Sequence, residues 1–153
     1  MNTAIKYYQN KASIAEISEH LAHCDTNFIP PLSSRANIDN YAKKIAITAT
    51  RFEAWSAEKL VGLVAAYCND AEHRIAFITS VSALTEWRGQ GVPSNLISRC
   101  IAHAKKNDFT LIKLEADSKN IPAIKLYEKS GFTSNQPNTP IIAMVLHIQN
   151  DGE

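Results

Sequence analysis

Two neighbouring stretches in the middle of the chain carry contrasting patterns of apolar and polar positions. Residues 75–82 are rich in β-branched and aromatic side chains, which predicts a largely buried β-strand. Residues 93–106 repeat their apolar positions with helical spacing, which predicts an amphipathic α-helix. The apolar face of that helix comprises Leu96, Ile97, Cys100, Ile101 and Ala104. The chain therefore runs from a strand, through a turn at 87–92, into a helix.

The N-terminal half of the chain predicts two helices and three strands. A capping-box pattern from Ser13 to Glu16 starts a helix that runs to about Cys24. A second helix is expected over residues 38–46, where apolar residues recur on one side. The strands are expected at residues 5–8, 50–55 and 60–68, with a hairpin turn at 56–59 and a further turn at 69–72.

The C-terminal part predicts a strand at 110–116, a short helix at 121–129 and final strands at Phe132 and 141–148. The strand at 110–116 should be parallel to the strand at 75–82, because a helix crosses between them. Gly131 should end the short helix, since glycine tolerates a positive φ. This order predicts an α/β protein of one domain, residues 1–153, with helices on both faces of a central mixed sheet.

The turn at 87–92, WRGQGV, is the first candidate for a binding site. A glycine-bearing turn that opens a helix presents unpaired N–H groups at the positive end of the helix dipole, which favours an anion and most often a phosphate. The turn is not a P-loop, because no Gly-Lys-Ser/Thr ends it, and it does not match the G-x-G-x-x-G dinucleotide pattern. An ordinary strand-to-helix turn is the alternative reading.

Two motifs together resemble one family. The turn has the pattern R-x-x-G-x-small from Arg88, and residues 120–132 read N-x-x-A-x-x-L-Y-x-x-x-G-F. Both are similar to signatures of the GCN5-related N-acetyltransferase (GNAT) family, and the resemblance covers roughly residues 60–132. It implies the GNAT-like acyl-CoA N-acyltransferase fold. It also implies acetyl-CoA as the acetyl-donor substrate, with no metal.

The resemblance also implies which residues hold the donor. The pyrophosphate would be bound by backbone N–H groups of the turn together with the side chain of Arg88, and the pantetheine arm by the main chain of Val81 and Ala83. The N–H donors expected in the turn are those of Gly89, Gln90, Gly91, Val92 and Ser94. The family usually has Gly or Ala where this chain has Pro93, so one N–H donor is missing.

Two further residues match functional positions of the family. Asn120 would contact the cofactor arm, and it also suits a helix N-cap. Tyr127 would lie near the cofactor sulfur and protonate the departing thiolate, because a phenol keeps its proton at neutral pH. The alternative for Tyr127 is a core aromatic residue. Glu115 matches a glutamate common in the family, with a structural role expected.

The sequence does not identify the general base. The strand at 75–82 holds no acidic residue or histidine. Glu53, Asp70, Glu72 and His73 are candidates on adjoining elements, and a water relay is an equal alternative.

The sequence does not identify the acceptor substrate either. Residues 27–35 contain two adjacent prolines, which exclude a regular helix or strand. The segment is either a connector whose Phe28, Ile29 and Leu32 cap the core or a loop that lines the acceptor pocket. We expect N-acetylation of a primary amine of a small molecule, such as an amino sugar or amino acid. The alternatives are a protein or peptide amine, or a CoA-binding regulatory module without turnover.

The composition limits the expected partners and the expected cellular compartment. The 153 residues are 45% hydrophobic and 20% charged with a net charge of +1, which gives no reason to expect nucleic acid or a membrane as a partner. No apolar run approaches the roughly 20 residues of a membrane span, and no signal-peptide pattern occurs. The three cysteines are widely spaced, which suggests free thiols in a cytoplasmic protein. A monomer and a homodimer both remain open.

A metal site is not expected. His20 and His23 lie near Cys24 on the predicted first helix, but no second cluster of ligands accompanies them. We interpret both histidines as surface residues.

Overall fold

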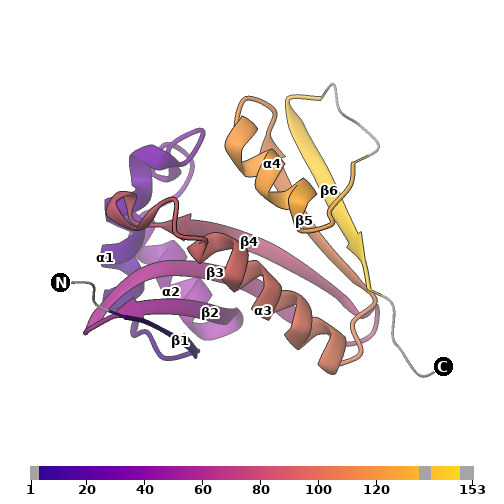
Figure 1. Ribbon diagram of the computed structural model, residues 1–153, viewed down its shortest axis with the longest axis horizontal. Coiled ribbons are helices and arrows are strands. Elements are labelled where there is room, and N and C mark those ends of the chain that lie inside the picture. The colour runs from indigo at the N-terminus through magenta and orange to yellow at the C-terminus, as the bar shows by residue number, and fades with distance from the viewer. Residues whose placement is uncertain (1–3, 135–138, 149–153) are drawn as a thin grey trace.

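The computed structural model describes residues 4–134 and 139–148, which form a six-stranded sheet in the order β1-β2-β3-β4-β5-β6 with helices against it (Figure 1). The strands are β1 (Ile5–Gln9), β2 (Thr50–Ser56), β3 (Lys59–Asp70), β4 (Ile75–Ala83), β5 (Leu111–Asp117) and β6 (Ile141–His147). The α-helices are α1 (Ile14–Cys24), α2 (Ile38–Thr48), α3 (Val92–Lys106) and α4 (Ile121–Lys129). Short 3₁₀ turns are η1 (Asp25–Asn27), η2 (Leu32–Ser34) and η3 (Thr85–Trp87).

The predicted fold class is confirmed. The sheet is mixed, because β4 and β5 are parallel while the other neighbouring pairs are antiparallel. Two clusters of buried apolar residues fill its two faces. One gathers residues of α3 and α4, such as Leu96 and Tyr127, and the other gathers residues of α1 and α2, such as Leu21 and Ile45. Helices therefore cover both faces, as the hydrophobic pattern predicted.

The capping box predicted for α1 is present. The Ser13 side chain accepts a hydrogen bond from the N–H of Glu16, and the Glu16 carboxylate accepts one from the N–H of Ser13. Two predicted boundaries are wrong. The turn expected at 69–72 begins later, because β3 continues to Asp70, and the strand expected at Phe132 is reduced to one bridge between Thr133 and Val145. Residues 135–138 of the predicted final loop lie outside the described residues.

The sheet opens between β4 and β5. These strands pair only where Ile75, Ala76 and Phe77 face 111–113, and beyond this point they diverge (Figure 1). On its other side β4 stays paired with β3 up to Ala83. The β3–β4 register shifts so that Ala65 faces Ser80 and Ala66 faces Ile78, which leaves Thr79 as the extra residue of a β-bulge. The bulge and the divergence together create the opening.

The helix α3 starts close to the sheet. Gly91 is its N-cap with φ 74°, and Val92 in the first turn is fully buried. A Cβ on Gly62 of β3 would lie 2.5 Å from Cγ1 of Val92, so only glycine permits this approach. The sequence of β3 thus fixes where the N-terminus of α3 lies relative to the opening.

None of the helices in the described residues is both long and apolar enough to cross a membrane.

Candidate active site

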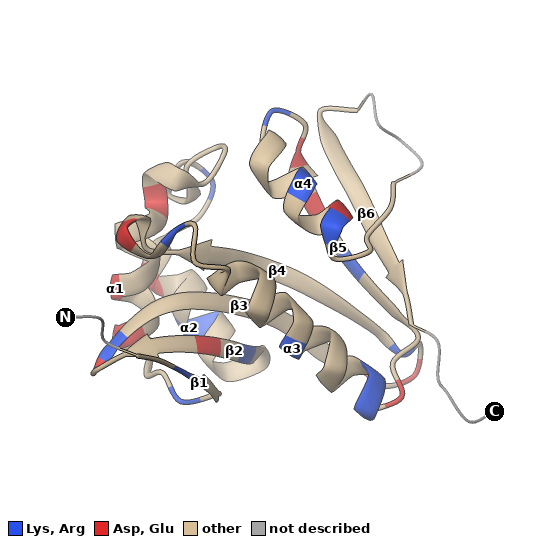
Figure 2. Ribbon diagram, viewed as in Figure 1, with Lys and Arg blue, Asp and Glu red and all other residues tan. Residues whose placement is uncertain are grey.

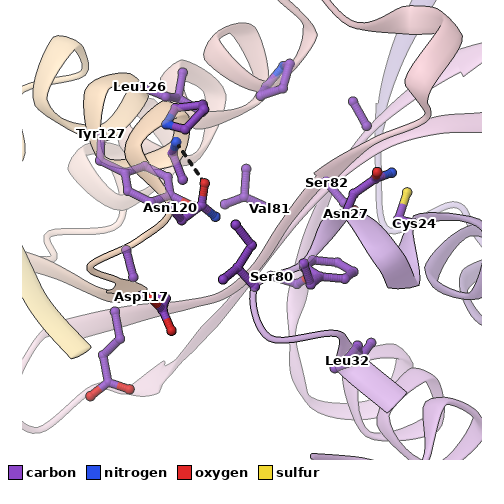
Figure 3. Close-up of a pocket in the computed structure, with 18 of the residues that line it drawn as sticks. Cys24, Asn27, Leu32, Ser80, Val81, Ser82, Asp117, Asn120, Leu126 and Tyr127 are labelled. Atoms are coloured by element: carbon purple, nitrogen blue, oxygen red, sulfur yellow. Dashed lines mark hydrogen bonds between the residues drawn. The ribbon is translucent and has the colours of Figure 1, made fainter. Parts of the chain in front are cut away.

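A cleft of about 440 Å³ lies where β4 and β5 separate (Figure 3). Its walls come from the end of α1, the connection from α1 to α2, α2 itself, β4, β5, the start of α3 and α4. Charged residues of both signs line it, Arg35 and Arg88 against Glu115 and Asp117. Figure 2 likewise shows both signs of charge distributed over the fold.

The structure brings together part of the predicted donor site. Those predicted residues that line the cleft are Val81, Ala83, Arg88, Gly89, Asn120 and Tyr127, and Pro93 lines it with them. The other residues of the predicted turn do not line it: Gln90, Gly91, Val92 and Ser94. The predicted role of the turn depends on its backbone N–H groups, which must be free of hydrogen bonds to bind an anion.

The turn before α3 leaves several N–H groups unsatisfied. Gly89 and Gly91 adopt positive φ angles of 78° and 74°. Among the described residues, no acceptor bonds the N–H groups of residues 89–92 or of Ser94. Pro93 occupies the second helical position, where it has no N–H to offer. The turn therefore presents several unsatisfied N–H groups at the start of α3, and Pro93 leaves one position without a donor.

Asn120 has the cap role that its position predicted. Its side chain accepts a hydrogen bond of 3.3 Å from the N–H of Ala123 at the start of α4. This contact uses the side-chain oxygen, so the amide N–H donors remain available on the cleft side.

Tyr127 is buried in α4 with its ring edge-to-face against Phe132, at 6.3 Å between ring centroids. Burial raises the pKa of Tyr127 to about 12. Within the described part of the chain, its hydroxyl has no hydrogen-bond partner, although the residue lines the cleft. The phenol is therefore protonated and free to donate.

The candidate general bases lie away from the cleft. Glu53 is fully buried and accepts hydrogen bonds from Arg51 Nε at 3.1 Å, from Trp55 Nε1 at 3.0 Å and from two backbone N–H groups at 3.1 Å. It is a structural carboxylate that ties the segment before α1 to β2. Asp70 and His73 bond each other at 3.0 Å in the exposed turn at the far end of β4, near Glu72.

The segment 27–35 contributes to both the cleft and the core. Phe28, Ile29, Leu32 and Arg35 line the cleft, while Leu32 is only 2% exposed and packs with α1 and α2. The Asp25 carboxylate fixes the segment by accepting hydrogen bonds from the Ser33 N–H at 2.7 Å and the Ser33 hydroxyl at 2.6 Å. These bonds hold the pKa of Asp25 below its usual range.

The interpretation of His20 as a surface residue is wrong. His20 is 2% exposed, and its ring bonds the Leu60 carbonyl and the Ser82 hydroxyl. The helical spacing of Ile17, Leu21 and Cys24 contained this signal, because it places His20 on the buried face of α1. His23 is exposed, and no group of three or more metal-ligating side chains occurs among the described residues.

A family profile described as acetyltransferase (GNAT) family matches residues 14–132. Among curated proteins, an uncharacterized N-acetyltransferase of Methanocaldococcus jannaschii is 32% identical over 94 residues. That match covers 59% of this chain and 42% of the relative, so the chain spans less than half the length of the relative that it matches.

Solved structures share the fold. The ribosomal-protein-S18-alanine N-acetyltransferase from Escherichia coli superimposes with a TM-score of 0.75 at 18% identity, covering 98% of this chain and 97% of that chain. An acetyltransferase of Bacillus anthracis, solved in complex with acetyl coenzyme A, gives a TM-score of 0.57 at 24% identity, covering 67% of this chain and 64% of that chain.

Proposed function

The chain belongs to the acetyltransferase (GNAT) family, and we propose that it transfers an acetyl group from acetyl-CoA to a primary amine of a small molecule. The family consists of N-acetyltransferases that take acetyl-CoA as donor. The observation that carries the proposal for this chain is the cleft between β4 and β5, with unsatisfied N–H groups at the start of α3 and a protonated phenol facing it.

The residues present fit acetyl-CoA. The N–H groups of residues 89–92 and of Ser94, with the guanidinium of Arg88, would bind the pyrophosphate by charge-assisted hydrogen bonds. Val81 and Ala83 lie in the part of β4 that β5 leaves unpaired, and an extended arm would gain main-chain partners along this edge. Asn120 retains free amide donors for the same arm. Acetyl-CoA supplies the acetyl group as a thioester, which is already activated for attack by an amine.

Tyr127 would protonate the departing thiolate. The raised pKa keeps its proton in place until negative charge develops on the sulfur. Transfer of the proton to the sulfur leaves a phenolate, which regains a proton by way of solvent from the amine that has attacked the thioester. Tyr127 is thus the proposed catalytic acid and one of the residues that contact the donor.

The acceptor is proposed to bind between segment 27–35 and β4. The same cleft extends from the proposed donor residues to this segment, where a small amine can lie beside the acetyl end of the donor. Arg35 offers a cation among the apolar side chains of Phe28, Ile29 and Leu32. The Tyr41 hydroxyl donates to the Thr79 carbonyl at 2.8 Å, so its oxygen can only accept from a ligand. A peptide amine is the second candidate, because a structure that covers 98% of this chain belongs to a ribosomal-protein alanine N-acetyltransferase.

The test is the release of free coenzyme A from acetyl-CoA across a panel of amines, measured with a thiol reagent. The panel contains glucosamine, free amino acids and short peptides with a free N-terminus. Turnover with glucosamine or an amino acid supports the proposal, and turnover with peptides alone favours the second candidate. Binding of CoA without turnover of any amine would identify a CoA-binding module and overturn the proposal.

We expect Pro93→Ala to tighten CoA binding by up to about tenfold, because it restores an N–H at the second position of α3 where one charge-assisted hydrogen bond can form. The measurement is the Kd of CoA by calorimetry. Pro140→Ala is the control, since Pro140 precedes β6 and does not line the cleft. A clear loss of affinity in Pro93→Ala with the fold intact would mean that the fixed φ of proline matters more than the donor.

A further inference from the structure

A buried chain of hydrogen bonds reaches from β3 to the cleft through α1. The ring of His20 lies between two groups: its Nδ1 is 3.1 Å from the carbonyl oxygen of Leu60, and its Nε2 is 2.8 Å from Oγ of Ser82. His20 is 2% exposed and Ser82 is 8% exposed. Ser82 lines the cleft, whereas none of the proposed roles in donor binding uses either side chain.

The geometry fixes the direction of these bonds. A carbonyl oxygen only accepts, so Nδ1 of His20 carries a hydrogen and donates it to Leu60. Burial lowers the pKa of His20 to about 4, which keeps the ring neutral and leaves a lone pair on Nε2. The Ser82 hydroxyl therefore donates to Nε2. The Cys24 thiol is farther from Nε2, at 3.8 Å, and burial raises its pKa to about 11, so it stays protonated and lies beside the Ser82 oxygen as a weak donor.

This direction determines what Ser82 presents to the cleft. Its hydrogen is committed to His20, so the oxygen offers lone pairs, which accept a hydrogen bond from a ligand N–H. Ser80 stands two residues earlier on the same face of β4, is 6% exposed and also lines the cleft. Its hydroxyl is buried beside the Tyr41 hydroxyl, which already donates to the Thr79 carbonyl at 2.8 Å, so Ser80 adds a second polar group to this wall.

We propose that Ser82 accepts a hydrogen bond from the amine of the acceptor substrate, and that His20 is the positioning residue that aims the Ser82 oxygen at this amine. The inference rests on the proposed function and names how its acceptor is held. Ser82 lies between Val81 and Ala83, the proposed backbone contacts of the donor arm. Figure 3 shows Ser82 on the side of Cys24 and Tyr127 on the side of α4, so an amine at Ser82 faces the donor sulfur from the opposite wall.

The role is orientation and not storage of a proton. A ring that resists protonation, with its other nitrogen bonded to a carbonyl, is a poor destination for the proton of an ammonium ion. Ser82 would orient the amine: it accepts one N–H of the amine, and this bond directs the nitrogen lone pair at the thioester.

The experiment compares Ser82→Ala, His20→Leu and His20→Gln in steady-state kinetics with acetyl-CoA and the best-accepted amine of the panel. Ser82→Ala and His20→Leu should raise the KM of the amine by about tenfold, the effect of one hydrogen bond. The KM of acetyl-CoA should stay within twofold. His20→Gln should restore most of the loss, because its side-chain oxygen can accept from Ser82 as Nε2 does. His23→Leu on the exposed side of α1 is the matched control.

The outcomes separate the two proposals. Parental amine KM in Ser82→Ala, with turnover intact, would overturn this inference and leave the proposed function standing. Equal losses in His20→Leu and His20→Gln, with normal Ser82→Ala, would show that His20 acts on stability alone. No turnover of any amine by the parent protein would overturn the proposed function and this inference together. Thermal melting with CoA confirms that each variant is folded, and Ser82→Ala serves where His20→Leu does not fold.

Discussion

Tyr127→Phe is expected to lower kcat by roughly 10- to 1000-fold, because it removes the proposed proton donor for the thiolate and nothing else. The ring packs edge-to-face on Phe132, and that contact survives the change. The hydroxyl has no hydrogen-bond partner among the described residues, so its loss breaks no bond of the folded state. Stability and the Kd of CoA should therefore stay near the parental values. Steady-state kinetics with an accepted amine, alongside a melting curve, provide the measurement.

The matched control is Tyr67→Phe. The hydroxyl of Tyr67 is also buried without a partner among the described residues, but Tyr67 does not line the cleft. Its removal should leave kcat unchanged. If Tyr127→Phe also keeps turnover within about twofold, and chemistry limits the rate, then Tyr127 is a core aromatic residue and the acid role is wrong.

The strand, turn and helix around residues 75–106 could be predicted because their signals are local. The spacing of apolar residues and the glycines of the turn determine these elements. The structure confirms them as β4 and α3, with Gly91 in the left-handed region. The opening of the sheet is not local. It depends on the register of β4 against β3 and β5, where Thr79 forms a bulge, and no pattern within residues 75–82 encodes that register.

Buried polar groups also differ in whether the nearby sequence predicts them. His20 was predictable in principle, since three apolar neighbours at helical spacing place it on the buried face of α1. Glu53 was not, because the N–H groups that satisfy it belong to Lys11 and Ala12, about forty positions away. A carboxylate in a strand gives no local sign that a distant loop will enclose it. Glu53, one of the candidate bases that the sequence left open, is therefore fully buried and does not line the cleft.

Gly91→Val should abolish the stabilisation of the protein by CoA. Gly91 caps α3 with φ 74° and ψ 15°, in the left-handed region that a β-branched residue strongly disfavours. Apart from its two chain neighbours, no atom of the described residues lies within 4 Å of a Cβ built there, so the change causes strain and not a clash. The turn should relax toward negative φ, which redirects the N–H groups proposed to bind the pyrophosphate.

In the parent protein, CoA at about 100 times its Kd adds about 2.7 kcal/mol to the free energy of unfolding, which raises the Tm by roughly 5–10 °C. In Gly91→Val the Tm without ligand should fall by a few degrees, and saturating CoA should leave it unmoved. Gly131→Val is the matched control, because Gly131 has φ 105° at the end of α4 and lies outside the turn that is proposed to bind the pyrophosphate. It should lose stability from strain and from the contact of its Cβ with Leu146 at 3.1 Å, yet keep the full shift with CoA. A parental shift in Gly91→Val would show that the turn does not bind the pyrophosphate, and an unmoved Tm in the parent protein would contradict donor binding itself.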